Sequence, residues 1–261
     1  MAPSAPTPAA PTWGEVAPDE LGRILVVSPH LDDAAMGAAH LIGTHHEVTV
    51  VTVFTGRPPR YPDPPADWDA QAGFGPADDV MAARREEDRS AMALLGATPV
   101  WLGFVEGKYL AAGQEATPEE VAVALEGAID SYRPTAVFVP MGLANPEHVV
   151  THAAAALVRE QRSQLSWFAY TDAGYMHLPG MLAWRISSLF RSGLWPTPAM
   201  VPVEPDAARK RRAVQSYTSQ LAPLTSEHAL RDRLDANVGE QYWRLAPPPP
   251  GWERMAEHPA P

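Results

Sequence analysis

A histidine and two aspartates lie within four residues of one another in the segment Ser28-Pro29-His30-Leu31-Asp32-Asp33. The apolar run 24–27 comes directly before them, so these polar residues are expected where a strand turns into a helix. His30 and Asp33 are of the residue types that bind borderline divalent cations, and Asp32 between them is left to act on water held by such a cation. The pattern predicts a hydrolytic metal site.

A second polar segment, residues 140–148, follows the fourth predicted strand and contains Asn145, Glu147 and His148. In a parallel sheet, ligands bind at the carboxyl ends of the strands, where the strand order reverses. We therefore expect His30, Asp33 and His148 to form a two-histidine, one-carboxylate site with an open position for water, the pattern of a catalytic zinc. Taken singly, a histidine after a strand is more often a capping or surface residue, and each aspartate could simply cap the helix that follows.

Short apolar runs alternate with segments of helical periodicity, which predicts an α/β fold. The sheet is expected to be Rossmann-like and mostly parallel, with helices on both faces. A Pro- and Asp-rich segment, residues 56–79, is interpreted either as a binding loop or as a disordered insertion. Strands are expected at residues 23–28, 48–54, 100–102, 136–139 and 167–170, and helices at residues 34–43, 77–95, 118–132, 148–161 and 205–215.

The C-terminal part is less regular, and we interpret it as a small extension packed on the main sheet. Its helices are expected at residues 185–194, 209–220 and 226–237, and its strands at residues 200–203 and 241–245. The predicted organisation is therefore an Ala/Pro-rich leader (1–18), a Rossmann-like core (19–184), the C-terminal extension (185–246) and a Pro-rich tail (247–261).

Composition limits the partners. The net charge of −11 argues against nucleic acid and anionic membranes as main partners and favours a small neutral or cationic substrate. Because the chain has no cysteine, disulfides and thiolate ligands are excluded, and any metal must be held by histidine and carboxylate. No apolar run is long enough for a membrane span. We expect a cytoplasmic protein and leave a homo-oligomer open.

The two polar segments resemble the motifs of the PIG-L/LmbE family of metal-dependent N-deacetylases, which read His-Pro-Asp-Asp-Glu and His-Pro-Asp-His. Arg84 and Glu87 fit the family's Arg-x-x-Glu helix ending in Leu-Gly. Residues 170–175 resemble its Tyr-Glu-Asp-x-Pro-Tyr segment, and residues 217–220 its Tyr-x-Ser-Gln segment. The resemblance covers residues 23–245.

This resemblance implies that His30, Asp33 and His148 are metal ligands and that Asp32 is the general base. The metal would be zinc, or another divalent ion such as Fe²⁺. The reaction it implies is hydrolysis of the amide of an N-acetylated amino sugar, usually of the glucosamine type, with acetate and a primary amine as products.

The chain departs from the family pattern in several places. Leu31 replaces a proline that carries no chemistry, and Ala34 replaces the glutamate of the first motif. Glu147 replaces the aspartate of the second motif, and Asn145 replaces its first histidine, which helps to stabilise the oxyanion. Asparagine can donate a hydrogen bond but cannot carry a positive charge. Losing one oxyanion interaction typically costs on the order of 100- to 1000-fold in rate.

A compensating group is available in His152, which follows His148 by four residues and shares its face of the predicted helix. The alternative for His152 is packing or exposure to solvent. For the substrate, we expect contacts from Arg84, Asp172 and Tyr175, although Arg84 is also compatible with a solvated helix surface. Trp68, Phe74 and Trp101 are candidate walls for stacking on a sugar, although Trp101 fits a core position better.

Three functions remain open. The leading hypothesis is a zinc-dependent N-deacetylase for an amino sugar or its conjugate. The first alternative, motivated by Asn145 and Ala34, is a catalytically impaired sugar- or metabolite-binding protein of the same fold. The second, a nucleotide-binding Rossmann protein, is weak because His-Leu-Asp-Asp follows the first strand where a Gly-rich phosphate loop would be needed.

Overall fold

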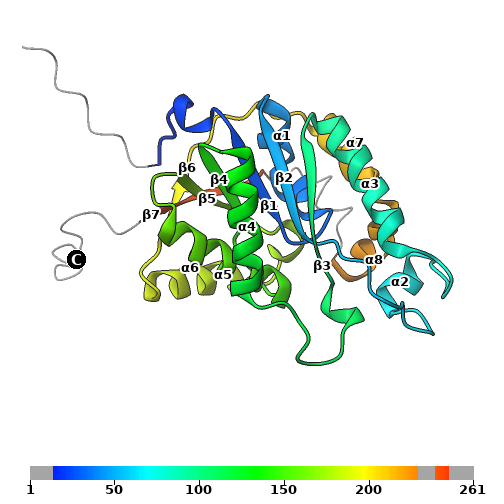
Figure 1. Cartoon of the computed structure of the whole chain (residues 1–261). Helices are drawn as coiled ribbons and strands as arrows, with labels where there is room; N and C mark the ends of the chain where they lie inside the picture. The colour runs from blue at the N-terminus through cyan, green and yellow to red at the C-terminus, as the bar shows by residue number, and fades with distance from the viewer. Residues whose placement is uncertain (1–13, 229–238, 247–261) are drawn as a thin grey trace, which may run out of the picture.

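The structure, a computed structural model, describes residues 14–228 and 239–246 and has the expected α/β fold (Figure 1). Its strands are Ile24–Ser28 (β1), Val48–Phe54 (β2), Thr98–Phe104 (β3), Ala136–Pro140 (β4), Ser166–Tyr170 (β5), Trp195–Ala199 (β6) and Tyr242–Ala246 (β7). Its α-helices are Asp33–Thr44 (α1), Asp67–Gln71 (α2), Val80–Leu95 (α3), Pro118–Tyr132 (α4), Pro146–Gln161 (α5), Met181–Arg191 (α6), Ala207–Gln215 (α7) and Thr218–His228 (α8). Short 3-10 helices lie at Pro18–Leu21 (η1), Gly107–Tyr109 (η2) and Ala173–Tyr175 (η3).

The strands form one sheet in the order β3-β2-β1-β4-β5-β7-β6. Strands β1 to β5 are parallel, and β7 pairs antiparallel with both β5 and β6. Because β1 pairs with β2 on one side and β4 on the other, the strand order reverses between β1 and β4. This confirms the expected Rossmann-like sheet and brings the two polar segments to the same edge.

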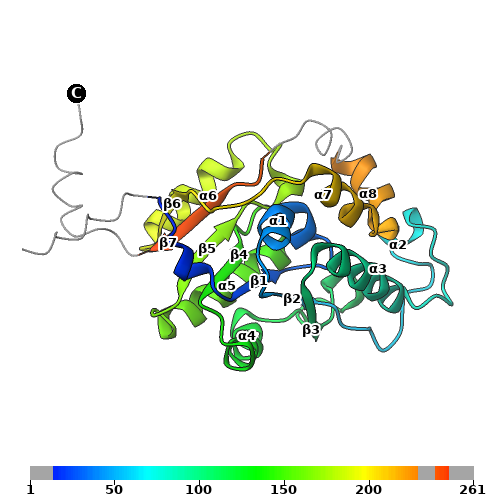
Figure 2. The same ribbon diagram turned by 90° about the horizontal axis from the view of Figure 1, so that it is seen from above.

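Helices cover both faces of the sheet. Figure 2 shows α4 and α5 on one face and α1, α3 and α7 on the other. Successive residues of β1 enter different apolar clusters: Ile24 and Val26 pack toward α1 and α3, whereas Leu25 and Val27 pack toward α4 and α5. A strand buried on both faces must be apolar at every position, which is why the run 24–27 has no polar residue.

Capping residues set the ends of two predicted helices, the start of α4 and the end of α3. Thr117 and Glu120 form a capping box at the start of α4, with Pro118 as the first helical residue, and the predicted bounds of this helix are confirmed. Gly96 ends α3 in a left-handed conformation with φ 79°. These short-range signals lie within one turn of the helix end, so they can be read directly from the sequence.

Two C-terminal predictions are wrong. The strand expected at 200–203 lies instead at Trp195–Ala199, where Pro196 and Pro198 lack the N–H groups that a central strand needs. β6 tolerates them because it is an edge strand. The helix expected at 209–220 is two helices, because α7 ends at Gln215 and α8 begins at Thr218. Of the helix expected at 226–237, residues 229–238 lie outside the described residues.

The C-terminal segment joins the main sheet, since β7 inserts between β5 and β6.

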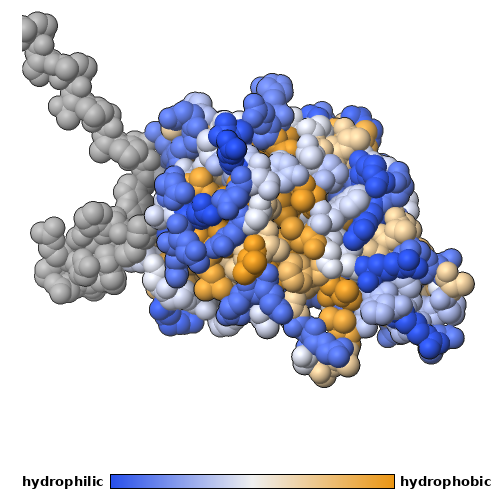
Figure 3. Space-filling view, in the orientation of Figure 1, coloured by the Kyte–Doolittle hydropathy of each residue, from blue (hydrophilic) through white to orange (hydrophobic). Residues whose placement is uncertain are grey.

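Hydrophobic residues reach the surface in places along the middle of the face drawn in Figure 3, and Val123 on α4 is 71% exposed. Single exposed hydrophobic residues are ordinary on protein surfaces. No helix in the described part of the chain is long and apolar enough to cross a bilayer.

Helix α1 packs unusually close to the end of β5. A Cβ atom at Gly37 would lie 2.7 Å from Tyr170 Cδ2 and 2.9 Å from the Thr171 carbonyl oxygen. The backbone departs from helical geometry at Ala38, and the carboxylate of Glu240 accepts the N–H groups of the next turn. The glycine therefore sets the distance between the helix that begins at Asp33 and the sheet.

We predict that Gly37→Ala destabilises the fold by about 1–3 kcal/mol, because the added methyl group overpacks a closed contact. Gly127→Ala on α4 is the matched control, since a Cβ there meets nothing within 4 Å. In the control the change is expected to raise stability by about 0.5–1 kcal/mol. Urea unfolding measures both, and equal effects of the two substitutions would contradict the close-approach argument.

A buried carboxylate ties α3 to β3 and to the start of α8. Asp88 is fully buried and accepts hydrogen bonds from Trp101 Nε1 at 2.7 Å and from the Tyr217 hydroxyl at 2.8 Å. Burial raises the pKa of Asp88 to about 6, although both hydrogen bonds favour the charged form. The folded protein therefore holds a proton here at pH values where the unfolded chain has released it.

It follows that the contribution of Asp88 to stability is present at low pH and is lost as the pH rises through about 6. Asp88→Asn should remove this decline, so that wild type loses thermal stability relative to the variant between pH 4.5 and 7. The measurement is the unfolding temperature against pH in chelator-treated protein. The same substitution at the exposed Asp130 is the control, and parallel curves for Asp88→Asn and wild type would disprove the assignment.

Candidate functional site

The turn after β1 places His30 and Asp33 through its own hydrogen bonds. The Ser28 hydroxyl donates to the His30 carbonyl oxygen at 2.5 Å and accepts the Ala34 N–H at 3.0 Å. Asp33 is the first residue of α1, and its Oδ2 accepts the His30 N–H at 3.0 Å. The short spacing in sequence thus folds both side chains toward one point.

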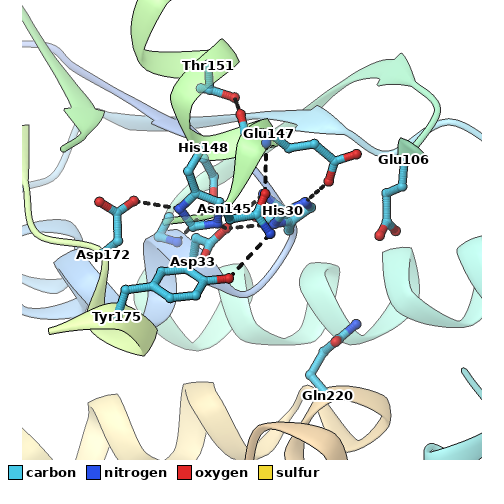
Figure 4. Close-up of polar contacts among 12 residues, drawn as sticks. His30, Asp33, Glu106, Asn145, Glu147, His148, Thr151, Asp172, Tyr175 and Gln220 are labelled. Atoms are coloured by element: carbon cyan, nitrogen blue, oxygen red, sulfur yellow. Dashed lines mark hydrogen bonds and ion pairs between the residues drawn. The ribbon is translucent and has the colours of Figure 1, made fainter. Parts of the chain in front are cut away.

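His148 arrives at the same point from the first turn of α5. Asn145 caps this helix through Oδ1, which accepts the Glu147 N–H at 2.8 Å, and Pro146 is its first residue. His148 Nε2 lies 3.1 Å from Asp33 Oδ2, and His30 Nδ1 lies 3.2 Å from the same oxygen. Figure 4 shows the two rings and the carboxylate converging, with Glu147 and Thr151 of α5 above them.

These three side chains form a candidate metal site, because one ligand atom from each lies within 4.8 Å of the others. Zinc bonds of about 2.0–2.2 Å in a tetrahedral arrangement separate neighbouring ligand atoms by about 3.3 Å. The separations of 3.1 Å and 3.2 Å at Asp33 Oδ2 match this spacing. The donor set therefore fits a zinc-type ion held by His30, Asp33 and His148.

A carboxylate holds the outer nitrogen of each histidine. His148 Nδ1 lies 2.6 Å from Asp172 Oδ1, while Asp172 Oδ2 accepts the Leu143 N–H. His30 Nε2 lies 2.5 Å from Glu147 Oε2, while Glu147 Oε1 accepts the Gly107 N–H. Such carboxylate–histidine pairs orient metal ligands and make them more basic. The link from Glu147 to His30 is not predicted from the sequence, where Glu147 is only a departure from a motif.

The charges of the site favour a cation. Although burial opposes it, the Asp33 and Asp172 carboxylates raise the pKa of His148 to about 9. Asp33 in turn has its pKa held well below the usual range, against burial, by His148 and His30. Burial and the adjacent Asp33 charge raise the pKa of Asp32 to about 7. Positive charge is thus stabilised where the three ligand atoms meet.

A second set of possible ligands, His30, Glu106 and Glu147, lies beside the first. Its carboxylates already have partners, since Glu106 Oε2 pairs with Lys108 Nζ at 2.8 Å and Glu147 holds the outer nitrogen of His30. The first set has a single carboxylate oxygen shared by two ring nitrogens, and it is the better candidate.

The three candidate metal ligands lie in the wall of a cavity of about 470 Å³. Asp32, Asn145 and Tyr175, all predicted site residues, line it together with His30 and Asp33. Asn145 Nδ2 donates to the Tyr175 hydroxyl oxygen at 3.3 Å (Figure 4). Apolar side chains contribute much of the remaining wall, among them Leu31, Met36, Phe54, Trp68, Val105, Val150 and Leu224.

Two predicted residues have other partners. His152 is buried, its Nδ1 lies 2.8 Å from the Pro140 carbonyl oxygen, and it is not among the residues that line the cavity. Burial and the neighbouring Arg185 lower its pKa to about 3, so the ring is neutral. Arg84 does line the cavity, but it is buried and its guanidinium pairs with Asp69 at 2.7 Å. Asp172 supports His148, as described above.

Two motifs that are far apart in the sequence bind each other. Glu87 on α3 accepts the Thr218 hydroxyl, the Ser219 N–H and the Ser219 hydroxyl at 2.6–2.8 Å. The carboxylate thereby caps the first turn of α8 and brings Gln220 into the cavity wall. The sequence contained both motifs but no signal that one holds the other.

Known proteins are similar to this chain in sequence and in fold. The family model described as "PIG-L: GlcNAc-PI de-N-acetylase" matches residues 25–158, more than half of the chain. None of the curated proteins matches the sequence significantly.

Three solved structures are similar over most of the chain. A deacetylase triple mutant (Orf2*T) of the teicoplanin biosynthetic pathway has 27% identity and a TM-score of 0.70, over 88% of this chain and 100% of that one. The A40926 pseudoaglycone deacetylase Dbv21 has 25% identity and a TM-score of 0.69, over 87% and 98%. The zinc inhibited form of teicoplanin deacetylase Orf2 has 25% identity and a TM-score of 0.70, over 88% and 100%.

The matched residues 25–158 include both polar segments, and the structure brings these segments together at one cavity. The chain therefore belongs to the PIG-L family of de-N-acetylases.

Proposed function

We propose that this protein is a zinc-dependent N-deacetylase that hydrolyses the amide of a small N-acylated amino sugar or its conjugate. The observation that carries the proposal is the convergence of His30, Asp33 and His148 beside Asp32 at the edge of a cavity. Family membership supports the reaction class, and the similar structures described as deacetylases support it further.

His30, Asp33 and His148 would hold the zinc ion, and Fe²⁺ is an alternative for the same donors. When bound, such an ion supplies Lewis acidity to an amide carbonyl group and acidifies water. Glu147 and Asp172 lie against the outer nitrogens of the two rings, and a proton held there would leave each inner nitrogen free to bind the ion.

Asp32 is the proposed general base. The residue is 7% exposed and lines the cavity, and it is not one of the three metal-ligand candidates. It accepts the proton of the attacking water and delivers it to the leaving amine nitrogen, which departs as a primary amine. Proton transfer by a positioned group typically contributes about 10²- to 10⁴-fold in rate.

Asn145 and Tyr175 are the proposed donors to the carbonyl oxygen as negative charge develops on it. The Asn145 amide is oriented, because Oδ1 caps α5 and Nδ2 is turned toward Tyr175. Burial raises the pKa of Tyr175 to about 12, so its phenol keeps its proton at neutral pH. Neutral donors of this kind act as an oxyanion hole when they are preorganised.

The impaired binding protein is the second candidate, and specific residues favour it. Asn145 is a strong helix cap, so the residue has a structural reason to be present without catalysis. Ala34 is fully buried, and no acid stands at this position of the first motif. Turnover decides between the two candidates.

We predict about one zinc per chain in wild type and in Asp32→Asn, and loss of zinc in Asp33→Ala and His148→Ala. Elemental analysis of the purified proteins measures this, with the exposed Asp130→Ala as the matched control. Amine release from N-acetylglucosamine conjugates should fall by at least about 100-fold in Asp32→Asn. Zinc retained by both ligand variants would refute the metal site, and normal turnover by Asp32→Asn would refute the base.

At position 145 the cap and the donor can be separated. Asn145→Ser keeps a good helix cap but is too short to reach Tyr175, so kcat should fall on the order of 100-fold with little change in stability. Asn145→His should raise kcat, because it adds a group able to carry positive charge. If Asn145→Ser retains the wild-type kcat, the amide has no role at the carbonyl oxygen.

A further inference from the structure

Gln220 stands at the edge of the cavity opposite the metal candidates, in the first turn of α8. Its side chain is largely buried, with the residue 9% exposed, and it lines the cavity. Glu87 fixes the two residues before it, and the Tyr217 hydroxyl is held by Asp88. The position of Gln220 therefore depends on two acids of α3 and not on the packing of α8 alone.

The orientation of the Gln220 amide is set by an indole. Trp68 Nε1 lies 2.7 Å from Gln220 Oε1, and an indole N–H can only donate. The amide oxygen must therefore face Trp68, which turns the NH₂ group the other way. Within the described part of the chain, no hydrogen bond to this nitrogen is found. Figure 4 shows it pointing into the open space that the carboxylate of Glu106 faces from the other side.

Trp68 is itself held in place by its neighbour in α2. Asp69 is buried and pairs with Arg84 at 2.7 Å, and it also accepts the Tyr109 hydroxyl at 2.7 Å. Charge-assisted hydrogen bonds of this kind are strong and geometrically specific, so they anchor α2 to α3. The 56–79 segment thus presents the indole to the cavity from an anchored helix.

On this basis, and resting on the proposed function, we infer that Gln220 is a specificity residue that donates a hydrogen bond from Nε2 to a hydroxyl group of the sugar, with Trp68 as its positioning residue. A hydroxyl group both accepts and donates, so it suits a space with the amide NH₂ on one side and the Glu106 carboxylate on the other. A ligand lacking that hydroxyl would leave buried polar groups without partners.

Gln220→Glu tests the donor, because a carboxylate still accepts from Trp68 but cannot donate. In the zinc-loaded Asp32→Asn background, which prevents turnover, calorimetry would measure binding of N-acetylglucosamine and of its 3-, 4- and 6-deoxy analogues. We expect Gln220→Glu to weaken binding of N-acetylglucosamine about tenfold, the size of one such hydrogen bond. The deoxy analogue that lacks the hydroxyl contacted by Gln220 should bind equally to Gln220→Glu and to its parent.

Gln215→Glu makes the same charge change at an exposed position of α7 and should leave every affinity unchanged. Equal binding of N-acetylglucosamine by Gln220→Glu and its parent would overturn the inference, as would absence of binding by the parent. Binding that discriminates the deoxy analogues without any turnover by wild type would instead contradict only the proposed function.

Trp68→Phe tests the positioning role, since it keeps an aromatic ring and removes the N–H donor. We expect KM for N-acetylglucosamine conjugates to rise about threefold to tenfold with kcat within about twofold. The exposed Trp184→Phe on α6 is the matched control. In the Gln220→Glu background, Trp68→Phe should add little to KM. Additive effects of the two substitutions would show that Trp68 does not act through Gln220.

Discussion

The parallel pairing of β1 with β4 is the constraint on which the site depends. It brings the ends of two strands that are more than 100 residues apart in sequence side by side at the edge of the sheet. Asp33, at the first turn after β1, and His148, at the first turn after β4, then meet at 3.1 Å. Neither turn would bind a metal alone, because each supplies an incomplete set of ligands.

Helix α3 provides the second level of organisation. Arg84, Glu87 and Asp88 lie three and four residues apart, so they share one face of the helix. Arg84 binds Asp69 of α2, whereas Glu87 and Asp88 both hold the start of α8: Glu87 caps its first turn, and Asp88 binds the hydroxyl of Tyr217, the residue before it. Charged side chains on a helix are usually solvated, but Arg84 and Asp88 are buried and Glu87 is partly buried. The walls of the cavity are therefore coupled to one rigid element.

Features set by interactions between residues close in sequence could be predicted, whereas those set by contacts between distant segments mostly could not. The His30–Asp33 pair and most element bounds come from signals within one or two turns, such as the capping box at Thr117. His148 was added by the rule that ligands of a parallel sheet bind where the strand order reverses. The partners of Glu147 and Arg84 could not be read in this way, because they depend on which distant segments meet. β6 was misplaced because its prolines violate the strand pattern, which only its position at the sheet edge permits.

The substitutions in the second motif have a common physical logic. Glutamate is one methylene longer than aspartate, and Glu147 spans from the start of α5 to the outer nitrogen of His30 while its other oxygen takes the Gly107 N–H. Asparagine at position 145 keeps a cap on the same helix and turns its NH₂ group toward Tyr175. The first turn of α5 thus fixes a metal ligand, the support of a second ligand and a hydrogen-bond donor. These residues are neighbours on one helix turn, so we expect the effects of substituting two of them together to be non-additive.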